Sequence, residues 1–189
     1  FNKFLSIFHK FLTDFYQNQG YRDFNIVQDT LIVNEEKNSL TLVITVDEGE
    51  KYKYRNFTFE GNKIASSDEL ETLLGLKEGG SYSKEEFEKA VFENMMSVYN
   101  DKGYIFSNVN PEIFPVGDNL LDINFLFNEG KKVYINNIFV SGNEKTRENV
   151  IRRELKLFPG DVFSRSKLMR SQRDIWILNY FDNVIPDVS

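Results

Sequence analysis

The chain has 189 residues, a formal net charge of −6 at pH 7, 41% hydrophobic and 15% aromatic residues, no cysteine and one histidine. This composition is too apolar for a disordered chain and supplies enough side chains for packed cores. The missing cysteine excludes disulfides and thiol chemistry, and the usual zinc sites and Ser-His or Cys-His pairs lack their parts. The acidity argues against nucleic acid as a partner, because such binding needs a basic surface. No apolar run approaches the roughly 20 residues of a membrane helix. Because the sequence starts with Phe, we expect an internal piece of a longer protein.

Residues 1–19 predict a helix that ends at Gly20, where a left-handed C-cap is needed. Its apolar residues recur at steps of three and four, which places them on one face. They are Phe1, Phe4, Leu5, Phe8, Phe11, Leu12, Phe15 and Tyr16. Residues 24–33 and 40–46 then alternate apolar and polar side chains around a polar turn at 34–39. This pattern predicts a β-hairpin with one buried face.

One stretch of the chain occurs twice. Residues 48–62, EGEKYKYRNFTFEGN, return without a gap as residues 129–143, EGKKVYINNIFVSGN. Each copy has the period-two pattern of a strand, and the pattern slips by one residue at the same place. Such a slip turns the buried face outward unless a bulge absorbs it, so we expect a bulge or twist at Asn56 and Asn137. Self-similarity of this kind indicates a repeat protein.

Two helices and two strands are predicted after the first copy. Ser66 and Ser83 each precede a glutamate by three residues, which is the spacing of a capping box at a helix start. The second of these helices is long and ends in Asp-Lys-Gly-Tyr at 101–104, much as Asn-Gln-Gly-Tyr ends the first helix. Strands at 105–114 and 120–127 follow. One complete unit is therefore β-α-α-β-β.

The same order starts again after the second copy. We expect a strand at 133–140, a helix from Thr146 and a longer helix from Ser164 to about Tyr180. The chain then divides into three α+β units. Residues 1–50 form the C-terminal part of one repeat, residues 51–131 a complete repeat and residues 132–189 the N-terminal part of a third.

This pattern resembles the POTRA domain, the polypeptide-transport-associated repeat of outer-membrane assembly proteins. The resemblance rests on the Gly-Asn pairs that end the repeated strands, the turns that end at Gly79 and Gly160, the Gly103-Tyr104 helix exit and the Glu-Gly joints. It is strongest for the BamA family of assembly factors, in the run 157–173. At the end of the long helix of the third unit, Asn179 and Tyr180 occur where the other two units have Gly-Tyr. The resemblance implies tandem repeats, each a three-stranded mixed sheet covered by two helices.

The resemblance also implies a function. POTRA repeats stand in the periplasm, tethered to the bacterial outer membrane through a C-terminal membrane β-barrel of the same chain. They guide unfolded outer-membrane proteins and hold accessory assembly lipoproteins. The repeats of a two-partner-secretion or translocation transporter, or of a division protein, are the alternatives. No catalytic role and no cofactor are expected, because His9, the single histidine, lies at the rim of its helix and no phosphate loop is present.

In this family the second strand of the unit is an exposed edge, which corresponds here to residues 24–31 and 109–114. An unpaired edge offers N–H and C=O groups to any extended peptide. The candidate polypeptide-binding residues are Phe24, Ile26, Gln28, Val109, Glu112, Ile113 and Phe114. Many small α+β domains leave an edge open without using it, and Pro111 removes one donor from the second edge.

A basic set in the third unit is the second candidate site. Its members are Arg152, Arg153, Lys156, Arg165, Lys167, Arg170 and Arg173. Arg152, Arg153, Arg165 and Arg170 are the candidates for facing an acidic partner, a neighbouring unit or anionic headgroups. Ordinary solvation of a helix surface is the alternative.

Overall fold

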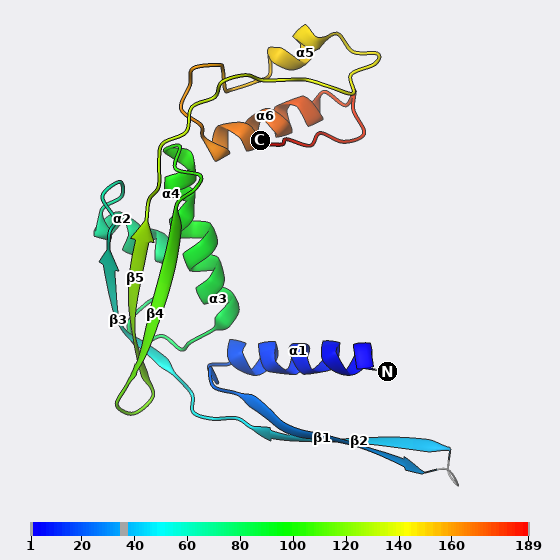
Figure 1. Ribbon diagram of the computed structural model, residues 1–189, viewed down its shortest axis with the longest axis vertical. Helices are drawn as coiled ribbons and strands as arrows, with labels where there is room; N and C mark the ends of the chain where they lie inside the picture. Colours follow the sequence, from blue (N-terminus) through cyan, green and yellow to red (C-terminus); the bar gives the residue numbers. More distant parts are fainter. Residues whose placement is uncertain (1, 35–37, 189) are drawn as a thin grey trace.

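The computed structural model describes residues 2–34 and 38–188. We refer to residues 1–50, 51–131 and 132–189 as the first, second and third units, and Figure 1 shows them following one another along the molecule. The first unit holds α1 (Asn2–Asn18), β1 (Asn25–Asn34) and β2 (Ser39–Asp47). The second holds β3 (Lys53–Glu60), α2 (Ser67–Leu74), α3 (Lys84–Glu88), the π-helix η1 (Lys89–Met95), α4 (Met96–Asp101), β4 (Asn108–Val116) and β5 (Leu120–Asn128). The third holds α5 (Glu148–Arg152) and α6 (Arg165–Ile177).

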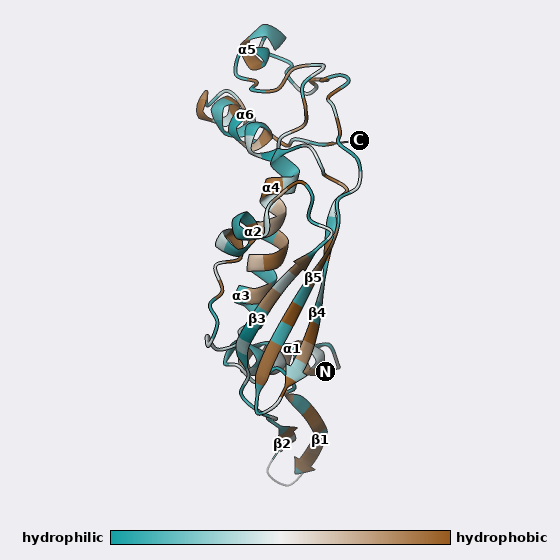
Figure 2. Ribbon diagram, turned by 90° about the vertical axis from the view of Figure 1, so that its left-hand side faces the viewer, coloured by the Kyte–Doolittle hydropathy of each residue, from teal (hydrophilic) through white to brown (hydrophobic). Residues whose placement is uncertain are grey.

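The second unit is a three-stranded sheet with helices on one side. Its strand order is β3-β5-β4, with β3 parallel and β4 antiparallel to β5. The α2 helix and the continuous helix α3–η1–α4 cover the same face (Figures 1 and 2). Both helix starts are capped as predicted, because the Ser66 hydroxyl accepts from the Glu69 amide and the Ser83 hydroxyl accepts from the Glu86 amide. The predicted mixed sheet under two helices is confirmed.

The core of the second unit lies between the sheet and these helices. On β5, Leu121, Ile123 and Phe125 are at most 1% exposed and alternate with half-buried polar residues. They pack against a helix face that includes Val91 and Met95, which are fully buried. Burying each such side chain stabilises the fold by about 1.5–3 kcal/mol. The period-two pattern of the strand thus fixes which side of the sheet the helices cover.

A bulge interrupts β3 where the sequence predicts one. The pairing of β3 with β5 shifts register between Tyr54 and Asn56, which leaves Arg55 as the extra residue. Arg55 forms a two-point ion pair with Asp122. The bulge therefore lets Tyr54 and Phe57 both contribute to the core while the guanidinium stays on the solvated side. The equivalent bulge at Asn137 is not formed, because its segment is not a strand.

The first unit has the predicted helix and hairpin, but the predicted buried face is wrong. Phe1 and residues 35–37 of the expected turn lie outside the described residues. The inward positions of β2 are only half-buried, and Phe4, Phe11 and Phe15 on α1 are at least 52% exposed. In the second unit β3 and α2 complete the core, whereas the described part of the first unit contains no counterpart of either element.

The predicted strand at 133–140 in the third unit is also wrong. The segment makes a single β-bridge, Tyr134 with Val162, and Phe139 is 89% exposed. Its counterpart β3 is a strand because β5 pairs with it along its length, and no described strand lies beside residues 133–140. The helix exit is formed despite the missing glycine, since Asn179 takes the left-handed conformation with φ of 57°. Among the described helices, none has the length and apolar character needed to cross a membrane.

Candidate functional site

The outer edges of β1 and β4 are the edges that the sequence predicts to be open. Each strand pairs on one side alone, β4 with β5 and β1 with β2. No other described strand lies against them. Each therefore presents a row of main-chain groups to one side, as a peptide-binding edge must.

The side chains of β4 project to the two faces of the sheet, so its outer edge presents mainly main-chain groups. Val109 is 7% exposed and belongs to the core, and Ile113 packs against the core from a half-buried position. Glu112 is half-buried opposite Asn124, and Phe114 is 51% exposed. The four candidates of this strand thus divide into two core residues and two residues of the opposite face.

Two prolines limit what the β4 edge can donate. Pro111 and Pro115 lie four residues apart and lack an N–H, so neither can hydrogen-bond as a donor. Proline within a sheet is confined to edge strands with its nitrogen facing away from the partner strand. Residues 109, 111, 113 and 115 then share the outward direction, and Val109 and Ile113 supply its donors. The β1 strand contains no proline.

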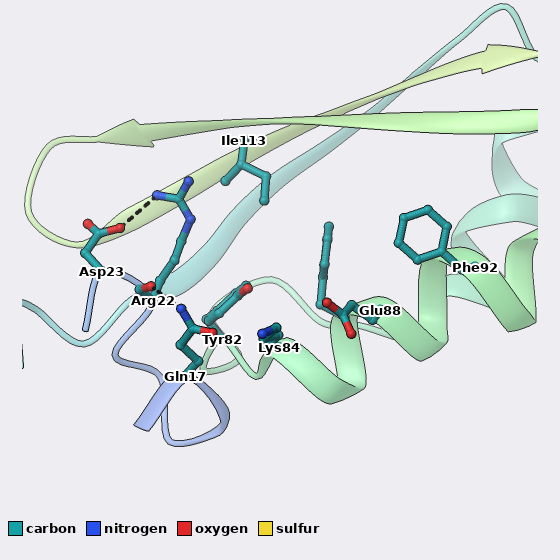
Figure 3. A pocket seen from close by; sticks show the side chains of 9 residues that line it. Gln17, Arg22, Asp23, Tyr82, Lys84, Glu88, Phe92 and Ile113 are labelled. Atoms are coloured by element: carbon teal, nitrogen blue, oxygen red, sulfur yellow. Dashed lines mark hydrogen bonds and ion pairs between the residues drawn. The ribbon is translucent and has the colours of Figure 1, made fainter. Parts of the chain in front are cut away.

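A pocket of about 410 Å³ lies beside β4, at the joint between the first two units (Figure 3). Its lining residues are Gln17, Arg22, Asp23, Tyr82, Lys84, Phe87, Glu88, Phe92 and Ile113. Ile113 connects the pocket to the β4 edge, and the aromatic rings of Phe87 and Phe92 provide an apolar wall. A chain that extends along β4 can therefore place side chains in a partly apolar and partly charged hollow.

The charged part of this pocket is tied together across the joint. Lys84 Nζ lies 2.8 Å from Asp14 Oδ1, and this contact raises the pKa of the ammonium. The Tyr52 hydroxyl donates to Asp23 Oδ2 at 2.7 Å, which raises the pKa of the phenol. Burial raises the pKa of Tyr82, so this phenol stays neutral and able to donate. The pocket is thus built from both units.

Sequence reasoning missed most of the pocket, because its walls come from elements far apart in the chain. Phe92 carried the clearest signal, since it is 52% exposed on a helix where Val91 and Met95 are fully buried. An aromatic residue off the inner face of an amphipathic helix has no role in the core. Arg22 and Gln17 offered no comparable signal.

The three candidates at β1 differ in burial and in their contacts. Phe24 precedes the strand, is 5% exposed and stacks on Tyr16 with ring centroids 4.2 Å apart. Its amide donates to the Tyr21 carbonyl, so it offers no free donor. Ile26 is half-buried, and the exposed Gln28 follows a register shift in the pairing with β2. The usable part of this edge therefore begins within β1.

The basic candidates lie on two helices of the third unit and differ in their partners. On α5, Arg152 forms a 2.6 Å ion pair with Glu148, and Arg153, the C-cap residue of this helix, pairs with Glu154 at 3.2 Å. On α6, Arg165 and Arg170 are exposed and form no ion pair with any described residue. The α6 pair has the charges available for a partner.

The face of the sheet opposite the helices is polar. Arg55 pairs with Asp122, and the amide of Asn124 links Thr58 to Glu60 at 2.9 and 3.0 Å. These bonds connect neighbouring strands, and Phe114 of β4, which is 51% exposed, adds an apolar side chain to this otherwise polar face. No group of His, Cys, Asp and Glu residues that could hold a metal ion occurs within residues 2–34 and 38–188.

Comparisons with known proteins agree with this architecture. The family model described as "POTRA: Surface antigen variable number repeat" matches residues 52–130 and 133–189. The outer membrane protein assembly factor BamA of Neisseria meningitidis is 36% identical over 92% of this chain. A putative outer membrane protein assembly factor of Treponema pallidum is 33% identical over 92% of this chain. The chain spans 22% and 21% of these two relatives.

Solved structures show the same fold. The crystal structure of Haemophilus influenzae BamA POTRA3-5 matches with a TM-score of 0.74 and 22% identity, covering 91% of this chain and 68% of that one. The structure of Haemophilus ducreyi BamA lacking POTRA domains 1-3 matches with a TM-score of 0.54 and 20% identity, covering 66% of this chain and 23% of that one.

Proposed function

Because the chain belongs to the POTRA family, we propose that it is the periplasmic arm of an outer-membrane protein assembly factor. It guides unfolded outer-membrane proteins by pairing their extended segments with the outer edges of β1 and β4. The factor is tethered to the outer membrane by a C-terminal β-barrel of the same chain, and residues 1–50, 51–131 and 132–189 belong to successive repeats. The similarity to assembly factors along 92% of the chain supports this role.

The observation that carries the proposal is the unpaired outer side of β4 beside a pocket. Main-chain pairing gives affinity without depending on the sequence of the client, which suits a factor that handles many clients. The prolines of β4 keep this affinity low, because they reduce the number of bonds that a client can form. Low affinity favours release, which a guiding role requires.

A peptide experiment tests the edge pairing. A 15N-labelled sample of the chain is titrated with an unfolded β-strand peptide of an outer-membrane protein. We expect the largest shift changes at amides of residues 26–31 and 109–114. The matched control is the same peptide N-methylated at alternate residues, which removes its hydrogen bonds along one edge while its side chains stay. Shifts confined to the helices, or equal binding by the N-methylated peptide, would overturn the proposal.

The accessory subunits are proposed to meet the third unit at α6. Arg165 and Arg170 are exposed and form no ion pair with a described residue, so an acidic lipoprotein surface can pair with them. Charge reversal of both residues should reduce recovery of accessory subunits in a pull-down. Reversal of Arg152 and Arg153, which already have partners, is the control. Unchanged recovery with the α6 variant contradicts this assignment.

A further inference from the structure

The same contact joins the units at both joints. Asn18, near the end of α1, accepts a hydrogen bond through Oδ1 from the Glu85 amide at 2.9 Å. Asp101, at the end of α4, accepts one through Oδ1 from the Ser166 amide at 2.7 Å. Each acceptor lies two residues before the glycine that ends its helix, and each donor lies two residues after the serine that caps the next long helix.

The serine at each helix start satisfies a different amide. Ser83 accepts from the Glu86 amide at 3.4 Å, and Ser164 accepts from the Lys167 amide at 3.3 Å. The first four N–H groups of a helix have no partner within the helix. The unit's own serine supplies one acceptor, and the preceding unit supplies the acceptor for the amide one residue earlier. The amide two residues after the serine therefore has its acceptor only in the presence of the neighbouring unit.

A main-chain bond accompanies the cap at both joints. The Tyr52 amide donates to the Gly20 carbonyl at 3.0 Å, and the Val133 amide donates to the Gly103 carbonyl at 2.8 Å. One bond holds the start of the repeated segment and the other holds the start of the long helix. Two bonds to separate elements restrict the relative orientation of the units more than a single bond does.

We infer that adjacent repeats bind each other through a docking surface in which one unit caps the long helix of the next. The residue type fits its surroundings at each joint. The Asn18 amide nitrogen lies 3.4 Å from a carboxylate oxygen of Glu85, where an aspartate would be repelled. Asp101 Oδ1 also accepts from the Ser164 hydroxyl at 3.2 Å, so one oxygen serves both donors at the start of α6.

The third unit lacks the residue for a further joint of this kind. Its long helix ends at the left-handed Asn179, and the residue two positions earlier is Ile177, which is 63% exposed. An isoleucine side chain has no acceptor. The end of α6 therefore lacks the acceptor that Asn18 and Asp101 supply at the two joints between described residues.

The inference is tested on the full chain with Asp101→Ala and Asp101→Asn. Loss of the cap should speed hydrogen exchange of the Ser166 amide about fivefold, the usual effect of removing a cap acceptor. Residual dipolar couplings should then require separate alignment tensors for the second and third units. Asp101→Asn keeps an acceptor oxygen, as Asn18 does at the first joint, and should match the wild type in both measurements.

Two controls keep the test decisive. Unchanged β3, β4 and β5 amide shifts show that the second unit is still folded, and Asp118→Ala in the exposed β4–β5 turn should alter neither measurement. Asn18→Ala repeats the test at the first joint, with the Glu85 amide as reporter. The inference is overturned if Asp101→Ala behaves like the wild type, or if Asp101→Asn behaves like Asp101→Ala.

Discussion

At the scale of single residues, the repeated Glu-Gly joint has a structural role that its sequence does not reveal. Glu129 Oε1 accepts from the Ile64 amide at 2.7 Å and so holds the loop between β3 and α2. Burial and then Glu129 raise the pKa of Tyr99. In the first unit Glu48 accepts from Tyr16, the residue equivalent to Tyr99. The glutamate thus ties the end of the hairpin to α1 in the first unit and the end of β5 to the β3–α2 loop in the second.

Glu129→Ala should destabilise the second unit by about 1–3 kcal/mol, because it leaves a part-buried amide without its acceptor. Urea unfolding monitored by far-UV circular dichroism measures the change in the free energy of unfolding. Glu78 is exposed, and Glu78→Ala should stay within about 0.5 kcal/mol of the wild type. Equal effects of the two substitutions would exclude a special role for Glu129.

Asp122 gives a pH dependence of predictable sign. Its hydrogen bonds from Arg55 lower its pKa below the ordinary value of 3.8. A carboxyl group with a lowered folded-state pKa stabilises the fold above its unfolded-state pKa, and this contribution is lost as the pH falls through the folded-state pKa. The effect should be small, because the pair is exposed to solvent. Asp122→Asn should therefore flatten the decline of the urea midpoint below about pH 4, and an unaltered decline would contradict the assignment.

At the scale of elements, the sequence predicts those parts whose stabilising partners lie close by in the chain. Capping serines and period-two strands located α2, β4 and β5 correctly, because caps and alternation are local signals. Residues 133–140 show the limit of this reasoning. The segment repeats the pattern of β3, yet it is no strand in the absence of a pairing partner. The edges of β1 and β4 were predicted through the family pattern, whereas the pocket depends on the packing of distant elements.

The prolines of β4 give a prediction for the edge itself. Pro111→Val should add an outward donor, provided that the nitrogen of residue 111 faces away from β5 as edge prolines do. One additional hydrogen bond contributes about 0.5–1.5 kcal/mol, so the affinity for an extended peptide should rise about two- to tenfold. Titration monitored by NMR measures it, with Pro186→Val, outside the sheet, as the control. Unchanged affinity would show that residue 111 does not meet the peptide.

At the scale of the whole molecule, the units are arranged in a row with very short connections (Figure 1). The joints place Gly20 and Gly103 against the start of the next unit, with φ of 105° and 90°. Short joints with such contacts leave little room for bending, so we expect a semi-rigid arm. Bending of such an arm would also change the pocket between the first and second units, because both units line it.

Alanine substitutions of Gly103 and Gly79 distinguish the cost of backbone strain from the effect on the contact between the second and third units. Both have positive φ, so alanine at either position should cost about 1–2 kcal/mol in strain. A Cβ at Gly79 would meet nothing within 4 Å, whereas at Gly103 it would lie 2.5 Å from Val162 Cγ1. Gly79→Ala should therefore weaken the second unit alone. Gly103→Ala also crowds Val162 Cγ1 and the Val133 carbonyl of the third unit, so we expect it to weaken the bond from the Val133 amide to the Gly103 carbonyl.

Hydrogen exchange of the Val133 amide distinguishes the two variants. Exchange should be faster in Gly103→Ala, because the acceptor of this amide is displaced. It should be unchanged in Gly79→Ala, when the two variants are compared under conditions that give their second units the same free energy of unfolding. This bond joins the second and third units. Its loss while β5 stays folded would mean that the orientation of the third unit depends on the absence of a Cβ at Gly103. Equal exchange in both variants would mean that the joint yields to the added methyl group, and the arm would then be more flexible than its short connections imply.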